Sequence, residues 1–276
     1  MRCVHPVRQP NKSGLGYTLR PCGLCMACRL NLARSWSLRI LHESFYHKES
    51  FFLTLTYDDE HFPINGSLNR EHFQLFMKRL RRRLDKVGIK YYACGEYGDE
   101  SLRPHYHALI FGWSPKDLRQ VSFKPGHYGY ESELIKEIWP YGFNLCGFVN
   151  QESIAYVTGY VRKKLGGKLA VKVYGKKERP FSLLSKGLGK RYAQDNEESI
   201  RQNLCLIYKG KKMSIPRYYR DLLKLDSEVF SVKRALNDIE RMNKMDLDLD
   251  EYQLAMKQSA IVAVKEKEHF IRRGVI

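Results

Sequence analysis

Residues 90–111 read KYYACGEYGDESLRPHYHALIF, and this stretch decides the fold class. Residues 90–97 and 105–111 have the aromatic and apolar content of strands, and the polar segment GDESLRP separates them. A connection this short permits only an antiparallel pair, because parallel strands need a crossover of roughly a dozen residues or more. The stretch therefore predicts a β-hairpin in the main sheet.

The flanking sequence predicts further elements around this hairpin. Residues 51–57 (FFLTLTY) and 143–149 have strand character, and helical patterns cover 27–46 and 131–139. Asn69 and Asn150 are good N-caps for two more helices, the second of which should run to about residue 165. The helix after Asn69 carries an apolar stripe formed by Phe73, Phe76, Leu80, Leu84 and Val87.

These elements predict an α+β fold with an antiparallel central sheet and helices on one face. We expect four segments along the chain. They are a Cys-rich N-terminal segment with a helix (1–50), the sheet core (51–166), a basic extension (167–225) and a helical C-terminal region (226–276). With 43% apolar residues, the chain can bury a core, and global disorder is excluded.

The charge of the chain points to a polyanionic partner. It carries 48 Lys and Arg against 30 Asp and Glu, a net charge of +18. Residues 159–220 hold 17 of the basic residues and only 4 acidic ones, as expected of a segment that lies along a phosphate backbone. The basic face of the helix after Asn69 is either solvated or in contact with DNA. No stretch approaches the length of a membrane span, so we expect no membrane partner.

A histidine pair opens the second strand of the hairpin. In Arg103-Pro104-His105-Tyr106-His107, the two histidines lie two residues apart and therefore share a face of the sheet. Glu96, at the end of the preceding strand, can lie across the hairpin from them, whereas Asp99 and Glu100 are competing carboxylates in the loop. Two imidazoles and a carboxylate leave open positions on a divalent ion such as Mg²⁺ or Mn²⁺.

Two tyrosines follow on the predicted helix after Asn150. Tyr156 and Tyr160 are four residues apart and Lys163 falls on the same face, with Lys164 beside it. A phenol with a pKa near ~10 is a weak nucleophile, but a metal ion and a nearby cation make it useful. Attack on a DNA phosphodiester would give a 5′-phosphotyrosine and a free 3′-OH.

Cysteines cluster near the N-terminus. Cys22, Cys25 and Cys28 are spaced by three residues, and with Cys3 they could form a four-thiolate structural zinc site. Free thiols in a reducing compartment are the alternative, and His5 could replace Cys3 as a ligand.

Taken together, these motifs resemble the HUH endonucleases, the rolling-circle replication initiators and relaxases. The chain most closely resembles initiators of Microviridae, the small single-stranded DNA phages, of the gokushovirus type. The matching stretches are PCGLCMACRLNLARSW, FFLTLTYDDEHFP, CGEYGDESLRPHYHALIFG, SIAYVTGYVRKKL and IPRYYRDLL. Tyr106 stands where the family pattern has a bulky apolar residue, and its aromatic ring can serve the same purpose on a core face.

The resemblance implies an HUH endonuclease core and a site-specific nick in origin DNA. Glu96 would be the third metal ligand, and Tyr156 and Tyr160 would alternate in successive cleavages, with Tyr156 cutting first. The protein would stay covalently linked to DNA and later rejoin unit-length circles. It would act in the cytoplasm of the infected bacterial host, with the host helicase and polymerase.

Alternatives remain open at this point. The same chemistry serves plasmid relaxases and single-strand transposases, and a non-catalytic, zinc-containing binder of single-stranded nucleic acid could use the same sheet and charge. The sequence contains no G-x-x-x-x-G-K-[ST] loop, so no nucleotide cofactor is expected.

Overall fold

The fold is that of a computed structural model, which describes residues 3–10, 16–85, 87–98, 101–124, 127–160 and 167–226, with short stretches between 229 and 258. The chain forms two compact units, one made of Met1–Ser35 with Ala193–Ile276 and the other of Trp36–Tyr192. The four segments expected from the sequence stay a prediction.

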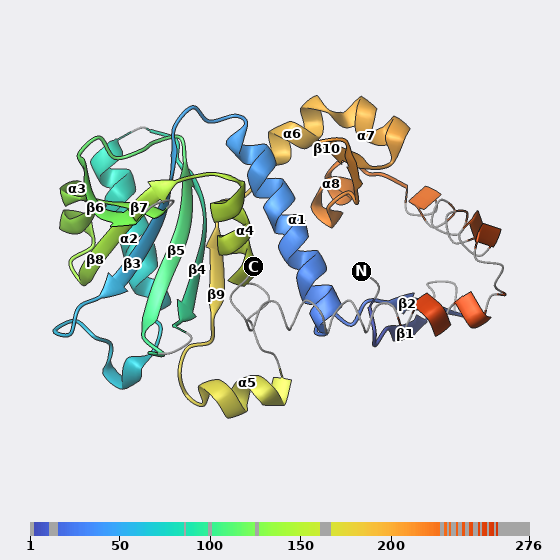
Figure 1. Cartoon of the computed structure of the whole chain (residues 1–276), viewed down its shortest axis with the longest axis horizontal. Helices are drawn as coiled ribbons and strands as arrows, with labels where there is room; N and C mark the ends of the chain where they lie inside the picture. Colours follow the sequence, from blue (N-terminus) through green and yellow to red (C-terminus); the bar gives the residue numbers. More distant parts are fainter. Residues whose placement is uncertain are drawn as a thin grey trace. The chain divides into compact units, whose positions relative to one another are not determined.

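A seven-stranded antiparallel sheet forms the centre of the unit at 36–192 (Figure 1). Its spatial order is β6-β7-β8-β3-β5-β4-β9. The strands are β3 (Ser50–Tyr57), β4 (Lys90–Tyr97), β5 (Pro104–Phe111), β6 (Leu118–Lys124), β7 (His127–Ser132), β8 (Gly142–Phe148) and β9 (Phe181–Leu184). The α+β class, the antiparallel hairpin and the strands expected near 51–57 and 143–149 are thereby confirmed.

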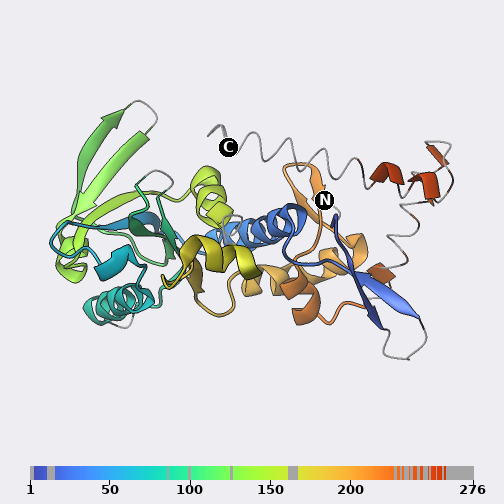
Figure 2. The same cartoon turned by 90° about the horizontal axis from the view of Figure 1, so that it is seen from below.

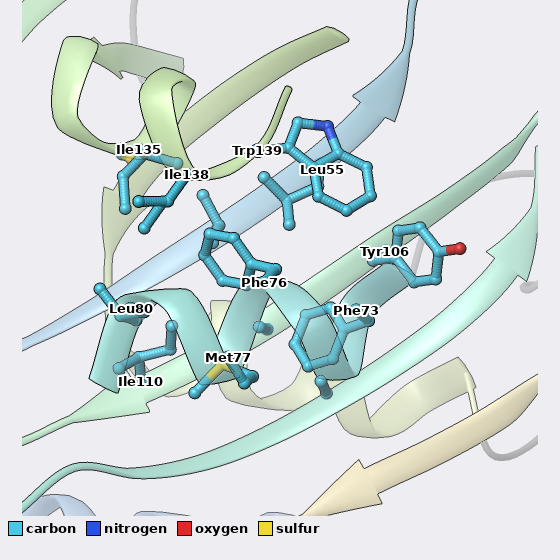
Figure 3. Close-up of a cluster of buried hydrophobic side chains, with 14 of the residues drawn as sticks. Leu55, Phe73, Phe76, Met77, Leu80, Tyr106, Ile110, Ile135, Ile138 and Trp139 are labelled. Carbon is cyan, nitrogen blue, oxygen red and sulfur yellow. The ribbon is translucent and has the colours of Figure 1, made fainter. Parts of the chain in front are cut away.

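One face of the sheet is covered by two helices, α2 (Arg70–Leu84) and α3 (Glu133–Ile138). Alternate residues of β3 and β5 point to this face and pack against the apolar stripe of α2. Figure 3 shows Phe73, Phe76 and Trp139 meeting Leu55 and Tyr106 in this core. Three of the stripe residues are buried, whereas Val87 lies beyond the helix end and is exposed.

The opposite face of the sheet is also covered, so the expectation of helices on one face was wrong. Ile40 of α1 (Met26–Ser44) and Ile154 and Val157 of α4 (Gln151–Gly159) pack there against Leu109 and Tyr92. The physical reason lies in β5, where residues 106–111 are all buried, a run typical of a strand covered on both faces.

Two asparagine caps fix where the helices on the two faces begin. The Asn69 side chain accepts hydrogen bonds from the backbone N–H groups of Glu71 and His72 at the start of α2. Asn150 and Ser153 form a reciprocal capping box at the start of α4. Both caps match the sequence prediction. The described part of α4 ends at Gly159, and residues 161–166, over which it was expected to continue, lie outside the described residues.

The remaining elements are short. A single 3₁₀ turn, η1 (Ile64–Gly66), precedes α2, α5 (Gly167–Tyr174) lies between α4 and β9, and α6 (Lys190–Asp195) follows β9. The other unit contains two hairpins, β1 (Val7–Pro10) with β2 (Tyr17–Arg20) and β10 (Leu206–Tyr208) with β11 (Lys211–Met213), and the helices α7 (Glu197–Asn203) and α8 (Arg217–Leu222). Between 229 and 258 every described residue except Asp248 is helical. Among the described residues, no helix is both long and apolar enough to span a membrane.

Candidate active site

The hairpin brings Glu96, His105 and His107 together on the face of the sheet that α4 covers. Glu96 pairs with His105 in the register of β4 and β5, and His107 lies one pleat further on the same face. The Oε1 atom of Glu96 is 2.8 Å from Nε2 of His105 and 3.4 Å from Nε2 of His107. One ligand atom from each of the three residues lies within 4.8 Å of the others, which suits a shared cation.

Glu96 is buried but remains a strong anion. Burial by itself would raise the pKa of this carboxyl, and the hydrogen bonds with His105 and His107 outweigh it and lower the pKa to about 2. Glu96 and His107 are each buried, whereas His105 is half-buried. The site is therefore a shielded negative charge between two imidazoles, with access to solvent on the His105 side.

Two further groups orient the imidazoles, and the sequence analysis missed both. Nδ1 of His105 lies 3.1 Å from the carbonyl oxygen of Arg103, and Nδ1 of His107 lies 2.9 Å from the hydroxyl of Thr54. A carbonyl oxygen only accepts, so Nδ1 of His105 carries a proton and Nε2 is the nitrogen available to a cation. Thr54 pairs with His107 in register, which was the available signal.

Tyr156 of α4 and Tyr160 directly after it both meet this site. The hydroxyl of Tyr156 is 3.5 Å from Nε2 of His107. The ring of Tyr160 stacks on the His107 imidazole, with centroids 5.0 Å apart and planes within 4° of parallel. The two phenol rings contact each other edge to face, with centroids 4.9 Å apart. The four-residue spacing thus placed both tyrosines correctly on one helical face.

The two tyrosines are not equivalent. Tyr156 is 51% exposed, whereas Tyr160 is 7% exposed. Burial raises the pKa of Tyr160 well above its usual range, and the negative charge of Glu96 raises it further. Tyr156 is therefore the phenol that an incoming strand can reach in this conformation.

Contacts from α1 and β4 fix the position of α4 over the sheet. The hydroxyl of Thr158, which is fully buried, lies 2.6 Å from that of Ser37 and also donates to the carbonyl of Ile154. The thiol of Cys94 points at the carbonyl of Val157. These contacts span the turn of α4 that carries the tyrosines.

Some residues named in the sequence analysis lie outside the described residues. They are Lys163 and Lys164, expected as cations beside the phenols, and the competing carboxylates Asp99 and Glu100.

The four N-terminal cysteines also converge. The sulfurs of Cys3 and Cys25 are 3.7 Å apart and those of Cys22 and Cys28 are 4.0 Å apart, and all four lie within 4.8 Å of one another. Backbone N–H groups donate to two of them, from Cys22 to the sulfur of Cys3 and from Cys25 to that of Cys22. Such donors stabilise thiolates.

Known proteins resemble this chain over the same region. The model of a family of replication-associated proteins, whose description names ORF2, matches residues 50–165, which contain Glu96, both histidines and both tyrosines. No solved structure matches at a comparable level of significance.

Three curated relatives are phage proteins. "Replication-associated protein VP4" of Bdellovibrio phage phiMH2K is 36% identical over 219 residues, covering 74% of this chain and 67% of the relative. "Replication-associated protein ORF2" of Spiroplasma virus 4 is 35% identical, covering 72% and 66%. "Replication-associated protein ORF4" of Chlamydia phage 1 is 33% identical, covering 75% and 54%. The matched part thus spans between about half and two thirds of each relative.

Proposed function

Because this chain belongs to the family of phage replication-associated proteins, we propose that it starts replication by cutting one strand of origin DNA with a tyrosine side chain. Its membership confirms the expected relationship to initiators of the Microviridae type. The observation that carries the proposal is the meeting of Glu96, His105, His107 and Tyr156 on one face of the sheet.

The donor set of the site fits Mg²⁺ or Mn²⁺. Two imidazole nitrogens and one carboxylate oxygen are within 4.8 Å of one another, and a hard divalent ion accepts this mixture while keeping positions open for phosphate oxygens. Such an ion, when bound, would draw negative charge from the phosphate under attack. Glu96, His105 and His107 are its proposed ligands, in an arrangement like that of the HUH endonucleases.

Tyr156 is the proposed nucleophile of the first cut. Its oxygen forms a bond to the phosphorus of the scissile phosphodiester, and the bond from phosphorus to the 3′ oxygen breaks. The phenol gives up its proton, and the departing 3′ oxygen takes one up and becomes a free 3′-OH. His107, whose Nε2 faces the Tyr156 hydroxyl, orients that hydroxyl toward the phosphate.

The reaction conserves a high-energy linkage. One phosphodiester is exchanged for one phosphotyrosine, so the reverse attack by a 3′-OH rejoins the strand without a nucleotide cofactor. Tyr160 is the proposed nucleophile of the second cut, after a change that exposes its hydroxyl. The free 3′-OH would be extended by a host polymerase behind a host helicase, in the host cytoplasm.

The test is a covalent adduct on origin single-stranded DNA in the presence of Mn²⁺ or Mg²⁺. We expect wild type to form a band that resists denaturation, and we expect the double variant Tyr156→Phe, Tyr160→Phe to bind DNA without forming it. A wild-type protein that binds tightly and never cross-links would favour the non-catalytic binder instead.

The cysteine cluster is proposed to hold a structural zinc ion. A tetrahedron with zinc–sulfur bonds of ~2.3 Å places its sulfurs about 3.8 Å apart, close to the 3.7 and 4.0 Å observed between two sulfur pairs. Four thiolates close the coordination sphere, so the ion would stabilise the fold and not take part in the reaction. Elemental analysis of the purified chain should give one zinc per chain, lost in Cys22→Ser, Cys25→Ser.

A further inference from the structure

The β1–β2 hairpin leaves its large apolar side chains exposed. It lies between Cys3 and Cys22, and Val7, Tyr17 and Leu19 on its strands are 55%, 69% and 66% exposed. An isolated two-stranded hairpin is marginal in water. The hairpin must therefore be held from its base, where the chain enters at Cys3 and leaves at Cys22, two members of the sulfur cluster.

The register of the hairpin gives its two faces different chemistry. Arg8 pairs with Leu19 and Pro10 pairs with Tyr17, so these four residues share one face, which we call the finger face. Gln9 points to the opposite face. All four residues of the finger face are exposed. Figure 2 shows the two strands lying side by side near the N-terminus.

The charge around the hairpin has a single sign. The first 42 residues contain no Asp or Glu, and their basic residues are Arg2, Arg8, Lys12, Arg20, Arg29, Arg34 and Arg39. A segment with only positive charge attracts a polyanion, and a guanidinium beside an exposed aromatic ring is a combination that binds an unpaired nucleotide. Tyr17 and Leu19, exposed together on one face, supply the ring and an apolar surface next to it.

From these observations we infer that the finger face is a second binding site for single-stranded DNA, in which Tyr17 stacks on a base and Arg8 contacts a phosphate. The inference rests on the proposed zinc site, which holds the hairpin at its base, and it adds to the proposed nicking function a DNA contact in a different unit of the chain. Stacking is open to any base, so this contact would add affinity and little sequence preference.

The test measures DNA affinity and zinc content together on the full chain. The background carries Tyr156→Phe and Tyr160→Phe, so that binding is separated from cleavage. Fluorescence anisotropy follows a labelled single-stranded thymidine oligonucleotide and, separately, a duplex of the same length. Tyr17→Leu removes the ring but keeps apolar bulk in the strand. Gln9→Ala, on the opposite face of the same strand as Arg8, is the matched control.

We expect Tyr17→Leu to weaken binding of the single strand roughly tenfold and to leave duplex binding unchanged, because a duplex offers no free base face. Arg8→Ala should reduce the slope of log affinity against log salt on the single strand by about 0.7. Gln9→Ala should change affinity by no more than about twofold. All three variants should keep their zinc.

Two results would overturn the inference. One is a Tyr17→Leu protein with full zinc content and unchanged affinity for the single strand. The other is a Cys22→Ser, Cys25→Ser protein that has lost zinc and still binds as tightly as its parent. A wild-type chain without zinc would instead refute the zinc site. Adduct formation, measured with both catalytic tyrosines present, reports separately on the nicking proposal.

Discussion

Tyr156 and Tyr160 occupy the same helical face and yet have different surroundings. Tyr156 is 51% exposed with its hydroxyl toward His107, whereas Tyr160 lies flat against the His107 ring and is 7% exposed. A buried phenol near the negative charge of Glu96 resists ionisation. The spacing of the two tyrosines was predictable from the sequence but this difference was not, because burial depends on α1 and on the sheet beneath.

Thr54 offers a prediction at the same scale. Its hydroxyl is 2.9 Å from Nδ1 of His107 and fixes the orientation of that imidazole. We expect Thr54→Val to weaken Mn²⁺ binding by roughly 10- to 100-fold, as is typical when a partner behind a metal ligand is lost. Calorimetric titration with Mn²⁺ measures this, and adduct formation should then need proportionally more Mn²⁺.

A matched control lies one pleat away on the same strand. Thr56 pairs with His105 in register, and within the described part of the chain its hydroxyl has no hydrogen bond to a histidine of the site. Thr56→Val should therefore bind Mn²⁺ as wild type does. Equal losses in the two variants would show that the Thr54 hydroxyl has no special role.

Among the elements, those with strong local signals were predictable. The alternation of β3, the apolar stripe of α2 and the caps at Asn69 and Asn150 are all local patterns, and each is confirmed. The β6–β7 hairpin and β9 were missed. The first is largely polar, with a bulge between Gln120 and Ser122, and the second is only four residues long within a basic segment. Which face a helix covers is a tertiary property, and the prediction of one covered face was wrong.

The cap of α4 leads to a prediction at the scale of elements. Asn150→Ala removes the hydrogen bond to the Ser153 N–H and should lower the free energy of unfolding by about 1 kcal/mol. Because the loss frays the helix that carries Tyr156, we also expect slower adduct formation. Asn69→Ala, which uncaps α2 on the opposite face of the sheet, should cost similar stability without slowing the reaction. Equal slowing in both variants would contradict this interpretation.

For the whole molecule, the buried His42 predicts a loss of stability in acid. His42 is 2% exposed and stacks on Tyr192 with centroids 3.5 Å apart. Burial lowers the pKa of His42 from 6.5 to about 4. Below pH 6.5 the unfolded chain therefore takes up a proton that the folded chain refuses. Stability is complete above pH 6.5 and falls as the pH drops toward 4, by about 3 kcal/mol in all.

Urea unfolding between pH 7.5 and 4 measures this effect. His42→Phe keeps an aromatic ring against Tyr192 and should lose less stability over the same range. His61→Phe is the control, because His61 is exposed and should leave the pH profile of wild type unchanged. A wild-type profile that is flat from pH 6.5 to 4 would refute the prediction.

The central claim is that Tyr156 makes the first cut, and mass spectrometry of the DNA-linked peptide tests it most directly. The adduct formed by wild type on origin single-stranded DNA is digested with protease and nuclease, and the modified residue is located by fragmentation. We predict that the nucleotide is attached to Tyr156 after the first turnover. Attachment to any residue other than Tyr156 would contradict the claim, and attachment outside the Tyr156–Tyr160 pair would refute the proposed site as a whole.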